Sequence, residues 1–399
     1  MRRVDIAVVG GGLAGSMAAA MLGRAGMDAL LIDPHEAYPP DFRCEKLDRS
    51  QVALLRKTGL ADAILGAAAL DGELTVARFG RVIDRKPNAQ YGILYDELVN
   101  TARAQIPAGT AILRAKAAAM SASAGRQEIR LSTGEEISAR LIVLANGLNS
   151  ALRQSLGMGR REISACHSIG IGFNVAPAGG ADFGFRALTY FPERGARWLA
   201  YISLFPIPSG LRANMFVYRG MQDLWLREMR HAPAETLLAA LPGLGKLLRD
   251  FEIVGPVQIR PVDLYRTTNL RRPGVVAIGD AFATSCPAAG TGVNKVLTDV
   301  ERLCSVYVPE WLSTAGMGAG KVARFYDDPV KQACDRHSEA KAHHLRALST
   351  EAGFAWSARR WGKFLGHFGM GRARDARSRL SVRLPRGGQT ALGSTPTAQ

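Results

Sequence analysis

The sequence predicts an α/β fold in which a parallel sheet covered by helices carries an inserted, mainly antiparallel sheet and is followed by C-terminal helices. Three observations predict this arrangement. Residues 4–33 have the pattern strand, glycine turn, helix, strand. Residues 161–220 are rich in aromatic and β-branched residues, and the chain after Lys321 is mainly helical and polar.

The N-terminal unit has the most regular pattern. Val4–Val9 is a short apolar run that ends at glycines, as expected of a buried parallel strand. Leu13–Arg24 is rich in Ala, Met and Leu and predicts a helix that ends at Gly26, and Ala29–Asp33 predicts the next strand. This βαβ unit predicts a Rossmann-type dinucleotide-binding domain.

Further elements are predicted along the chain. Asp48 and Ser50 are both good N-cap residues for a helix that runs to Leu60. Gly134 predicts the turn of a hairpin between two short strands. The remaining predictions are helices over 95–105 and 293–303, and strands over 128–131, 136–144 and 275–278.

The composition indicates what class of protein this is and in which compartment it is expected. The chain has 399 residues, of which 47% are hydrophobic and 22% charged, so a globular protein with a large core is expected. The five cysteines are odd in number and never in C-x-x-C spacing, which favours a reducing, cytoplasmic location over a disulfide framework or a metal site. The sequence contains no run of 18 apolar residues, so no membrane span is expected.

The net charge of +16 is concentrated near the C-terminal end, where 15 Lys and Arg stand against 6 Asp and Glu from Lys321 onward. This predicts either peripheral contact with a membrane or an acidic carrier protein, or a solvated tail that only aids solubility; no nucleic acid partner is expected. Trp361, Phe364, Leu365 and Phe368 would share one helical face, which would lie in a membrane interface or pack on the body of the protein.

The first chemical motif is Gly10-x-Gly12-x-x-Gly15, between the first predicted strand and helix. Gly10 permits the tight turn, Gly12 lets the backbone approach a pyrophosphate, and Gly15 allows close packing of helix and strand. Asp33 ends the second strand, where its carboxylate can accept hydrogen bonds from ribose hydroxyls. These residues alone do not distinguish NAD from FAD.

The second motif distinguishes the two cofactors. The strand over 275–278 ends at Gly279-Asp280, and Pro287, Gly290 and Gly292 precede a helix. An acid at the end of a strand can hold the hydroxyls of a ribityl chain. Glycines before a helix allow backbone N–H groups to reach a flavin pyrimidine, which becomes anionic on reduction.

This second motif resembles that of the group A flavoprotein monooxygenases, whose superfamily also contains flavin-dependent halogenases and geranylgeranyl reductases. The resemblance spans roughly residues 1–330 and implies an FAD cofactor with NAD(P)H as electron donor. It is carried by Gly279-Asp280-Ala281, Pro287, Gly290-x-Gly292 and Asn294.

Other segments resemble the same family, with departures. Asn146-Gly147 through Arg153 is similar to the family's D-G-x-x-S-x-x-R motif, but Asn146 replaces the aspartate, which puts conventional use of NADPH in doubt. Ala283 stands where the family usually has histidine. Arg43–Leu47 is similar to the stretch that runs along the flavin, so Arg43 is either a contact of FAD or a surface arginine.

The resemblance implies a cytoplasmic flavoprotein oxidoreductase that acts in biosynthesis. The leading hypothesis is a monooxygenase that uses O2 and a flavin C4a-hydroperoxide to hydroxylate an apolar or aromatic small molecule. The alternatives are a reductase of isoprenoid double bonds similar to the geranylgeranyl reductases, a halogenase, and a non-catalytic binder similar to the Rab GDP-dissociation inhibitors. The halogenase is disfavoured because the chain has no W-x-W-x-I-P segment.

No residue is singled out as catalytic. Alternation over 198–206 places Tyr201 and Phe205 on one face of a strand and Trp198 and Leu204 on the other, and one of these faces is expected to line a substrate cavity. The candidate cofactor-binding residues are Gly10, Gly12, Leu13, Ala14, Gly15, Asp33, Arg43, Gly279, Asp280, Pro287, Gly290, Thr291 and Gly292.

The expected organisation follows from these motifs. We assign the FAD-binding domain to 1–78, 94–160 and 263–328, the substrate-binding sheet domain to 79–93 and 161–262, a helical region to 329–383 and a disordered tail to 384–399.

Overall fold

A parallel strand at the N-terminus organises the first sheet. β1 pairs in parallel with β2 on one side and with β11 on the other, and its residues from Ile6 to Val9 are buried because both faces of the sheet are covered. The antiparallel pair β10–β11 turns at Gly134, which has φ +86°, as predicted. The strands lie in the order β8 (Ala111–Leu113), β2 (Ala29–Ile32), β1 (Arg2–Val9), β11 (Glu136–Leu144), β10 (Gln127–Leu131) and β9 (Ala117–Ser121), with β17 (Val275–Ala277) paired to β11.

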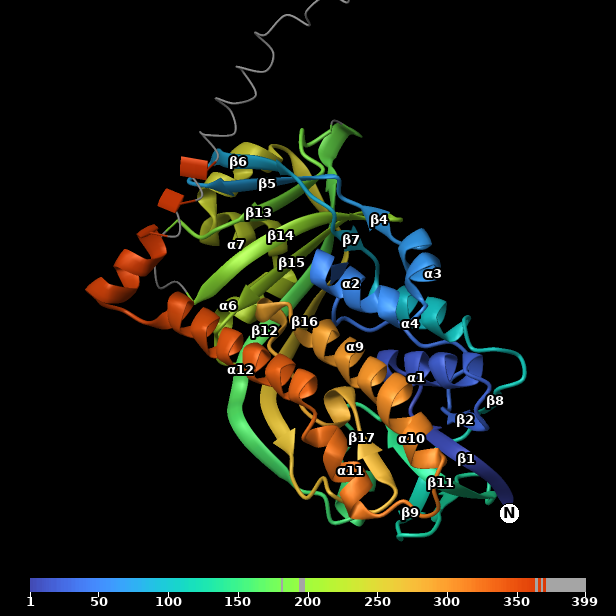
Figure 1. The fold of residues 1–399 in the computed structure, drawn as a ribbon. Coiled ribbons are helices and arrows are strands. Elements are labelled where there is room, and N and C mark those ends of the chain that lie inside the picture. Colours follow the sequence, from blue (N-terminus) through green and yellow to red (C-terminus); the bar gives the residue numbers. More distant parts are fainter. Residues whose placement is uncertain (181, 194–197, 363–364, 367–368, 371–399) are drawn as a thin grey trace, which may run out of the picture.

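The protein is described by a computed structural model, shown in Figure 1. The structure describes residues 1–180, 182–193, 198–362, 365–366 and 369–370. The predicted tail over 384–399 and two residues of the predicted apolar face, Phe364 and Phe368, therefore lie outside the described residues.

Helices predicted from the sequence cover the first sheet. α1 (Leu13–Arg24) packs against β1 and β2 with most of its side chains buried. α2 (Arg49–Lys57) is capped by Asp48, whose side chain accepts the N–H groups of Ser50 and Gln51, so Asp48 rather than Ser50 is the N-cap. The other helices of this unit are α3 (Ala61–Gly66), α4 (Tyr95–Arg103), α5 (Ala151–Ser155), α9 (Gly292–Arg302) and α10 (Val308–Leu312), with a π-helical segment (Leu303–Tyr307) between the last two.

The second sheet is built on two long antiparallel strands, β12 and β16, which pair over most of their length. Its strands lie in the order β16 (Phe251–Thr267), β12 (Arg160–Pro177), β15 (Gly210–Val217), β14 (Leu199–Ile207), β13 (Ala187–Tyr190), β5 (Glu73–Arg78) and β6 (Arg81–Pro87). A small third sheet lies beside it and consists of β3 (Lys46–Leu47), β7 (Tyr91–Gly92) and β4 (Ala69–Leu70).

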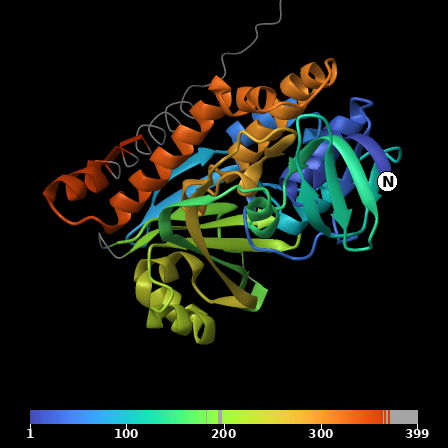
Figure 2. The same ribbon diagram turned by 90° about the horizontal axis from the view of Figure 1, so that it is seen from below.

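Two features of this sheet differ from the sequence-based expectation. β5 pairs with β6 and β13, so the boundary expected at residue 78 falls after a strand that belongs to the second sheet. Three unpredicted short helices, α6 (Leu224–His231), α7 (Pro233–Ala240) and α8 (Gly245–Leu248), pack their leucines on one face of the sheet. In Figure 2 these yellow helices lie on the side of the sheet opposite the orange C-terminal helices.

The C-terminal helices α11 (Ala319–Tyr326) and α12 (Pro329–Thr350) agree with the helical pattern predicted after Lys321. α12 runs beside α9 (Figure 1) and also contacts β14, so it touches both large units. Within the part of the chain that the structure describes, we find no helix long and apolar enough to span a bilayer. The α/β fold with an inserted antiparallel sheet and C-terminal helices is therefore confirmed.

Candidate active site

The glycine turn between β1 and α1 forms one end of a large cavity. Gly10 has φ +104°, and a Cβ atom there would lie 2.6 Å from the carbonyl oxygen of Ala145, so only glycine fits. A Cβ at Gly15 would lie 1.8 Å from the carbonyl oxygen of Gly10, which explains the close packing of helix and strand. Gly12, Leu13 and Ala14 line the cavity, and no side chain caps the first turn of α1. The N–H groups of this turn can therefore bind an anion.

Asp33 lies at the end of β2, as predicted, and lines the same cavity. Its carboxylate accepts the N–H of Gly11 at 2.6 Å and the N–H of His35 at 3.0 Å. Arg103 of α4 forms an ion pair with it at 3.3 Å, a contact that the sequence did not indicate. Asp33 is thus held rigidly at the rim, where a ribose hydroxyl would meet it; that ribose contact stays a prediction.

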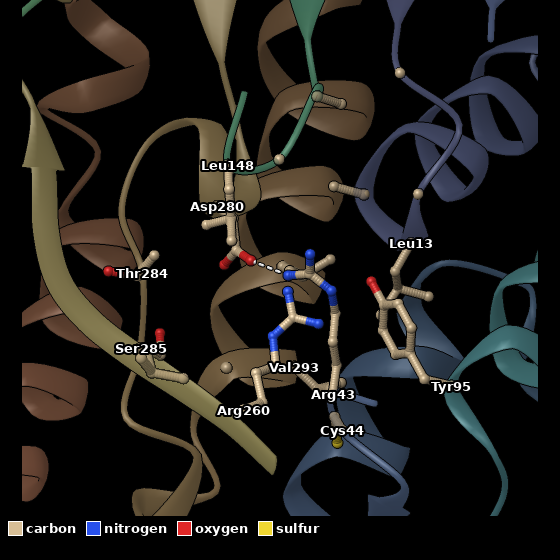
Figure 3. A pocket seen from close by; sticks show the side chains of 18 of the residues that line it. Leu13, Arg43, Cys44, Tyr95, Leu148, Arg260, Asp280, Thr284, Ser285 and Val293 are labelled. Atoms are coloured by element: carbon tan, nitrogen blue, oxygen red, sulfur yellow. Dashed lines mark hydrogen bonds and ion pairs between the residues drawn. The ribbon is translucent and has the colours of Figure 1, made fainter. Parts of the chain in front are cut away.

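Asp280 and Arg43 meet inside the cavity (Figure 3). Arg43 Nη1 lies 2.5 Å from Asp280 Oδ2, and Arg43 Nε lies 2.6 Å from Asp41 Oδ2. Arg43 lines the cavity with 23% of its side chain exposed, so of its two expected positions the structure favours the one beside the cofactor site. Burial lowers the pKa of Arg43, but Asp280 and Asp41 outweigh this effect and raise it, so the guanidinium stays charged.

A second arginine, Arg260 of β16, was not indicated by the sequence. Its guanidinium also forms an ion pair with Asp41 and points toward Arg43 and Asp280 in Figure 3. Burial raises the pKa of Asp41, but the two arginines outweigh burial and hold it below its usual value. The two guanidiniums and the carboxylates of Asp41 and Asp280 balance one another in formal charge, so this cluster offers a ligand hydrogen-bond donors and acceptors without a net positive charge.

The second glycine-containing motif, residues 279–292, forms another wall of the cavity. Gly279, Asp280 and Ala281 form the 3₁₀ turn η3, and Pro287–Ala289 form η4, which ends at Gly290 with φ +63°. Gln51 of α2 donates to the carbonyl oxygen of Gly290 at 2.8 Å and fixes this loop. Pro287, Gly290 and Gly292 line the cavity, as predicted.

Three candidate residues are near the cavity without lining it. Gly15 serves the packing of α1, and Gly279 (φ +59°) donates its N–H to Asp299 of α9 at 3.0 Å. The hydroxyl of Thr291 bonds Ser338 of α12 at 2.7 Å, so this side chain anchors the loop instead of facing the cavity.

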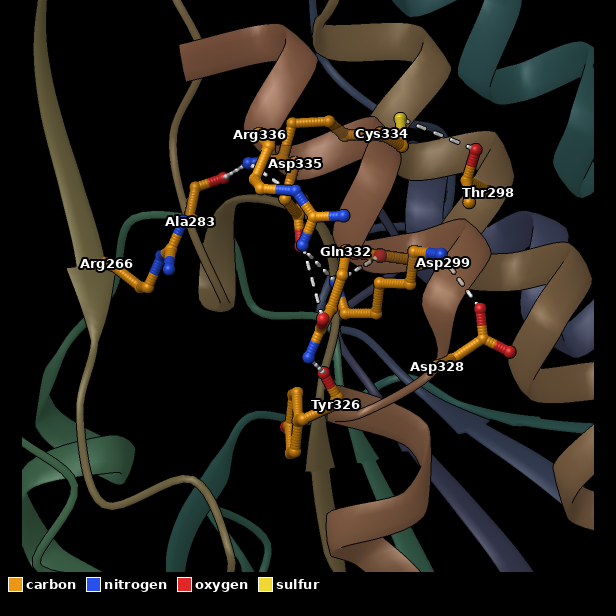
Figure 4. Close-up of polar contacts among 12 residues, drawn as sticks. Arg266, Ala283, Thr298, Asp299, Tyr326, Asp328, Gln332, Cys334, Asp335 and Arg336 are labelled. Carbon is orange, nitrogen blue, oxygen red and sulfur yellow. Dashed lines mark hydrogen bonds and ion pairs between the residues drawn. The ribbon is translucent and has the colours of Figure 1, made fainter. Parts of the chain in front are cut away.

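A buried group of charged side chains on α9 and α12 lies next to the turn that carries Asp280 (Figure 4). Lys331 of α12 lies 2.6 Å from Asp299 and 3.2 Å from Asp335, and Lys295 of α9 lies 3.6 Å from Asp335. Lys331 Nζ is also 3.7 Å from the ring centroid of Phe282. Because Asp299 also accepts the N–H of Gly279, α12 is linked through one carboxylate to the turn that carries Asp280.

Two residues differ from the motifs of the family that the sequence resembles, and the first of them, Asn146, lies at the cavity; the second, Ala283, is next to the lining residue Thr284. Asn146 lines the cavity, its side-chain N–H donates to the carbonyl oxygen of Asn149 at 3.0 Å, and its buried side-chain oxygen has no hydrogen-bond partner among the described residues. The carbonyl oxygen of Ala283 accepts Lys295 Nζ at 3.3 Å. The unpaired oxygen of Asn146 indicates a place where a ligand donor would be satisfied.

The second sheet supplies the remaining wall. Tyr201, Ser203 and Phe205 alternate along β14 and face the cavity, whereas Ile202 and Leu204 are buried in the core on the other side. The predicted shared face of Tyr201 and Phe205 is therefore the cavity face. Trp198 precedes the strand with φ +58° and is 46% exposed, so it does not share a buried face with Leu204.

The segment after Arg43 holds residues that the sequence did not single out. Glu45 is buried and forms a two-pronged ion pair with Arg212 of β15, at 2.7 and 3.0 Å. Lys46 lines the cavity and donates to Ser203 Oγ at 2.9 Å. The only available signal was their position next to a segment that resembles the flavin-side stretch of the family.

The walls enclose one cavity of 710 Å³ that runs from the glycine turn to the aromatic face of the second sheet. One part offers helix N–H groups, two arginines and a carboxylate, and the other offers Tyr201, Phe205 and Phe216. The first set fits the phosphates and hydroxyls of a flavin dinucleotide, and the second fits an aromatic molecule. Among the described residues, no group of three or more His, Cys, Asp or Glu side chains is arranged to hold a metal ion.

Comparisons with known proteins agree with this geometry. A family model described as FAD binding domain matches residues 3–308. The chain is 25% identical over 370 residues to the 3-demethoxyubiquinol 3-hydroxylase of Escherichia coli, which covers 82% of this chain and 87% of that protein. It is 33% identical over 164 residues to the menaquinone reductase of Mycobacterium tuberculosis, which covers 38% of this chain and 40% of that one.

Among solved structures, p-nitrophenol 4-monooxygenase PnpA from Pseudomonas putida superposes with a TM-score of 0.74 and 16% identity. The superposition covers 96% of this chain and 98% of that chain. At this identity the likeness establishes the fold, including the insertion of the second sheet.

Proposed function

The chain belongs to the FAD binding domain family, and from this membership we propose that it is an FAD-dependent monooxygenase that hydroxylates an aromatic small molecule. The observation that carries the proposal is the single cavity that joins the dinucleotide end to the aromatic face of β14 and β15. A cofactor and an aromatic substrate held in one enclosed space are what such a reaction requires.

The protein's own residues would bind and orient the cofactor. The N–H groups of the first turn of α1 would bind the phosphates, and Arg43 and Arg260 would add hydrogen-bond donors while they remain paired with Asp41 and Asp280. Asp280 would accept hydroxyl groups of the ribityl chain. The chemistry that FAD supplies when bound is the transfer of two electrons from a nicotinamide coenzyme to O2, with one oxygen atom going to the substrate and the other to water.

The sheet would position the substrate and exclude water. Tyr201 donates its hydroxyl to the carbonyl oxygen of Ala288 at 2.9 Å, so its ring is fixed against the loop that carries Gly290. Phe216 packs beside Tyr201 with ring centroids 5.2 Å apart. These rings would hold an aromatic substrate next to the cofactor loop and would shield one face of it from water.

The first test is the visible spectrum of the purified protein. We expect bound FAD in the wild type and loss of most of it in Asp280→Ala, because this carboxylate has no substitute at the ribityl position. Asp62→Ala, at the start of α3, is the control and should keep its flavin. A colourless wild type that cannot be reconstituted with FAD would contradict the proposal.

The second candidate function is reduction of a quinone or isoprenoid, favoured by the similarity to the menaquinone reductase. The two reactions differ in their use of O2. Hydroxylation requires O2 and places one of its atoms in the product, whereas reduction proceeds without it. Product formation from quinol and phenol candidates under isotopically labelled O2, compared with anaerobic turnover, distinguishes them.

For the location of the protein we propose peripheral contact with an anionic membrane through the C-terminal region. Phe354 is 90% exposed, and Leu365 and Met370 are exposed, on a strongly basic stretch. Trp361, by contrast, stacks on Phe79 of the β5–β6 turn, so this part of the predicted face packs on the substrate sheet. Salt-sensitive co-sedimentation with anionic vesicles, lost on truncation after Glu351, would support the contact, and absence of binding by the full chain would refute it.

A further inference from the structure

Lys46 places its side-chain amine in the cavity, and among the described residues it has no carboxylate partner. Its ammonium group donates to Ser203 Oγ at 2.9 Å and lies 5.4 Å from the ring centroid of Phe205. Among the described residues no Asp or Glu oxygen lies within 4.0 Å of it. Two nearby residues of the same segment do form ion pairs: Arg43 with Asp280 at 2.5 Å and Glu45 with Arg212 at 2.7 Å.

The two carboxylates that raise the pKa of Lys46, Asp71 and Asp48, are already engaged by other groups. Asp71 accepts hydrogen bonds from the side chain of Asn88 at 2.5 Å and from the N–H of Gln90 at 3.1 Å. Asp48 caps α2 through the N–H groups of Ser50 and Gln51. The adjacent Cys44 is partly buried, and desolvation raises the pKa of its thiol to about 11, so it is neutral near pH 7.

The backbone of Lys46 is held in place. β3 pairs with β7 at Lys46 and Gly92, and a Cβ on Gly92 would lie 2.0 Å from the carbonyl oxygen of Pro206 in β14. Because the third sheet is packed this closely against β14, the stem of Lys46 cannot swing far from the cavity. Burial lowers the pKa of the ammonium, and the nearby carboxylates only partly offset this effect.

An ammonium held in an apolar site gains most from an anionic oxygen delivered by a ligand. The walls near Lys46 are the rings of Phe205, Tyr201 and Phe216, which suit a flat aromatic or conjugated ligand. We propose that Lys46 is the specificity-determining residue of the substrate site and selects aromatic or conjugated substrates that carry an acidic hydroxyl, bound as the phenolate or enolate. This inference rests on the proposed function.

The pairing involves no redox step. On binding, the proton of the ligand hydroxyl passes to Lys46 Nζ or to solvent, so that the bound pair is an ammonium and a phenolate or enolate, and Ser203 continues to orient the ammonium. The neutral methyl ether of the same ligand fits the same rings but cannot form the ion pair, so the ratio of the two dissociation constants isolates the role of the charge.

The test uses the full-length FAD-loaded protein and three probes, 2-naphthol, 4-hydroxybenzaldehyde and 4-nitrophenol, each paired with its methyl ether. Binding is followed by the perturbation of the flavin spectrum. We expect the wild type to bind at least one phenol about tenfold or more tighter than its ether. The ultraviolet band of the bound phenol should report the anion at a pH about one unit below that of the free phenol.

Lys46→Met should bring the ratio close to one while the ether binds as before, and Lys46→Arg should retain part of it. Lys116→Met removes a charge from a different part of the cavity lining and should leave the ratio unchanged, which controls for long-range electrostatics. Equal flavin content in all variants shows that they are folded. Absence of phenol preference in the wild type, binding of no probe, or preference retained in Lys46→Met would overturn the inference.

Failure of the proposed function would be recognised separately. A protein that binds FAD and hydroxylates a substrate but shows no phenol preference contradicts only the role of Lys46. A protein without flavin contradicts the proposed function itself.

Discussion

Lys331 on α12 is buried, whereas Lys46 on β3 is partly buried and lines the open cavity, and the partners of the two side-chain amines differ. Lys331 is 1% exposed and has two carboxylates, Asp299 and Asp335, within 3.2 Å. Lys46 has one hydroxyl, one aromatic ring and an open cavity. The first lysine completes a set of charges within the protein, whereas the second leaves a charge to be completed by a ligand.

A lysine removed from water can serve the fold or a ligand, and its partners distinguish the two cases. Lys331, Lys295, Asp299 and Asp335 carry two positive and two negative charges, so the group is neutral as a whole and needs no ligand. An unpaired buried charge lowers the stability of the folded state, and such a cost is expected where a binding site uses it.

The largest effect is expected from Lys331→Met. Removing this ammonium leaves Asp299 and Asp335 with only Lys295 between them, and loss of one partner of a buried ion pair costs about 3–5 kcal/mol. Because Asp299 also holds the N–H of Gly279, flavin retention should fall as well. Urea unfolding and flavin content measure both, with Lys341→Met, on an exposed position of the same helix, as the control. Unchanged stability would show that the charge group is not structural.

A smaller effect of opposite sign is expected from Lys46→Met. Without ligand, this variant should be as stable as the wild type or up to about 1 kcal/mol more stable, because it removes a desolvated charge. The pKa of Lys46 is lowered in the folded state, so the wild type should regain stability relative to the variant as the pH rises from that lowered value toward 10.5. Thermal unfolding of both proteins across this alkaline range checks the sign. Marked destabilisation of the variant at pH 7 would place Lys46 with Lys331 as a structural residue.

The smallest effect is expected at Asn146. Its buried side-chain oxygen has no hydrogen-bond partner among the described residues, whereas Lys46 has a hydrogen bond but no ion pair. The resembling family has an aspartate here, so we expect reduction of the flavin by NADPH alone to be slow and to become a few-fold faster in Asn146→Asp, which corresponds to about 1 kcal/mol or less. Stopped-flow reduction without substrate measures this, and Asn149→Asp is the neighbouring control. Rapid reduction of the wild type, or an unchanged rate in Asn146→Asp, would refute it.

Much of the cofactor end could be predicted because its signals are local. Gly10, Gly12 and Asp33 lie within one βαβ unit, and Asp280, Gly290 and Gly292 lie within one strand–loop–helix segment. Local spacing and the family resemblance therefore singled out residues that the structure places around one cavity, and their contacts with the cofactor stay predictions. The sequence could not show that Thr291 faces Ser338, because that contact depends on how α12 packs on α9.

The substrate end was less predictable because its contacts join distant segments. Arg212 of β15 meets Glu45 across 167 residues, and Lys46 meets Ser203 of β14 across 157. Alternation along β14 correctly paired Tyr201 with Phe205, and Ser203 lies on the same face by the same rule. The boundary at residue 78 and helices α6–α8 were missed because strand and helix propensities there are overridden by packing on the second sheet.

β16 has a mechanical consequence. Tyr265 in this long strand donates its hydroxyl to the carbonyl oxygen of Asp280, and Thr267 donates its hydroxyl to the carbonyl oxygen of Ala281. β16, which forms one edge of the second sheet, is thus bonded directly to the turn that carries Asp280. Moving the second sheet away from this turn would break both of these bonds. We therefore expect ligands to enter and leave through movements of side chains and loops at the rim, with the two sheets remaining in fixed register throughout turnover.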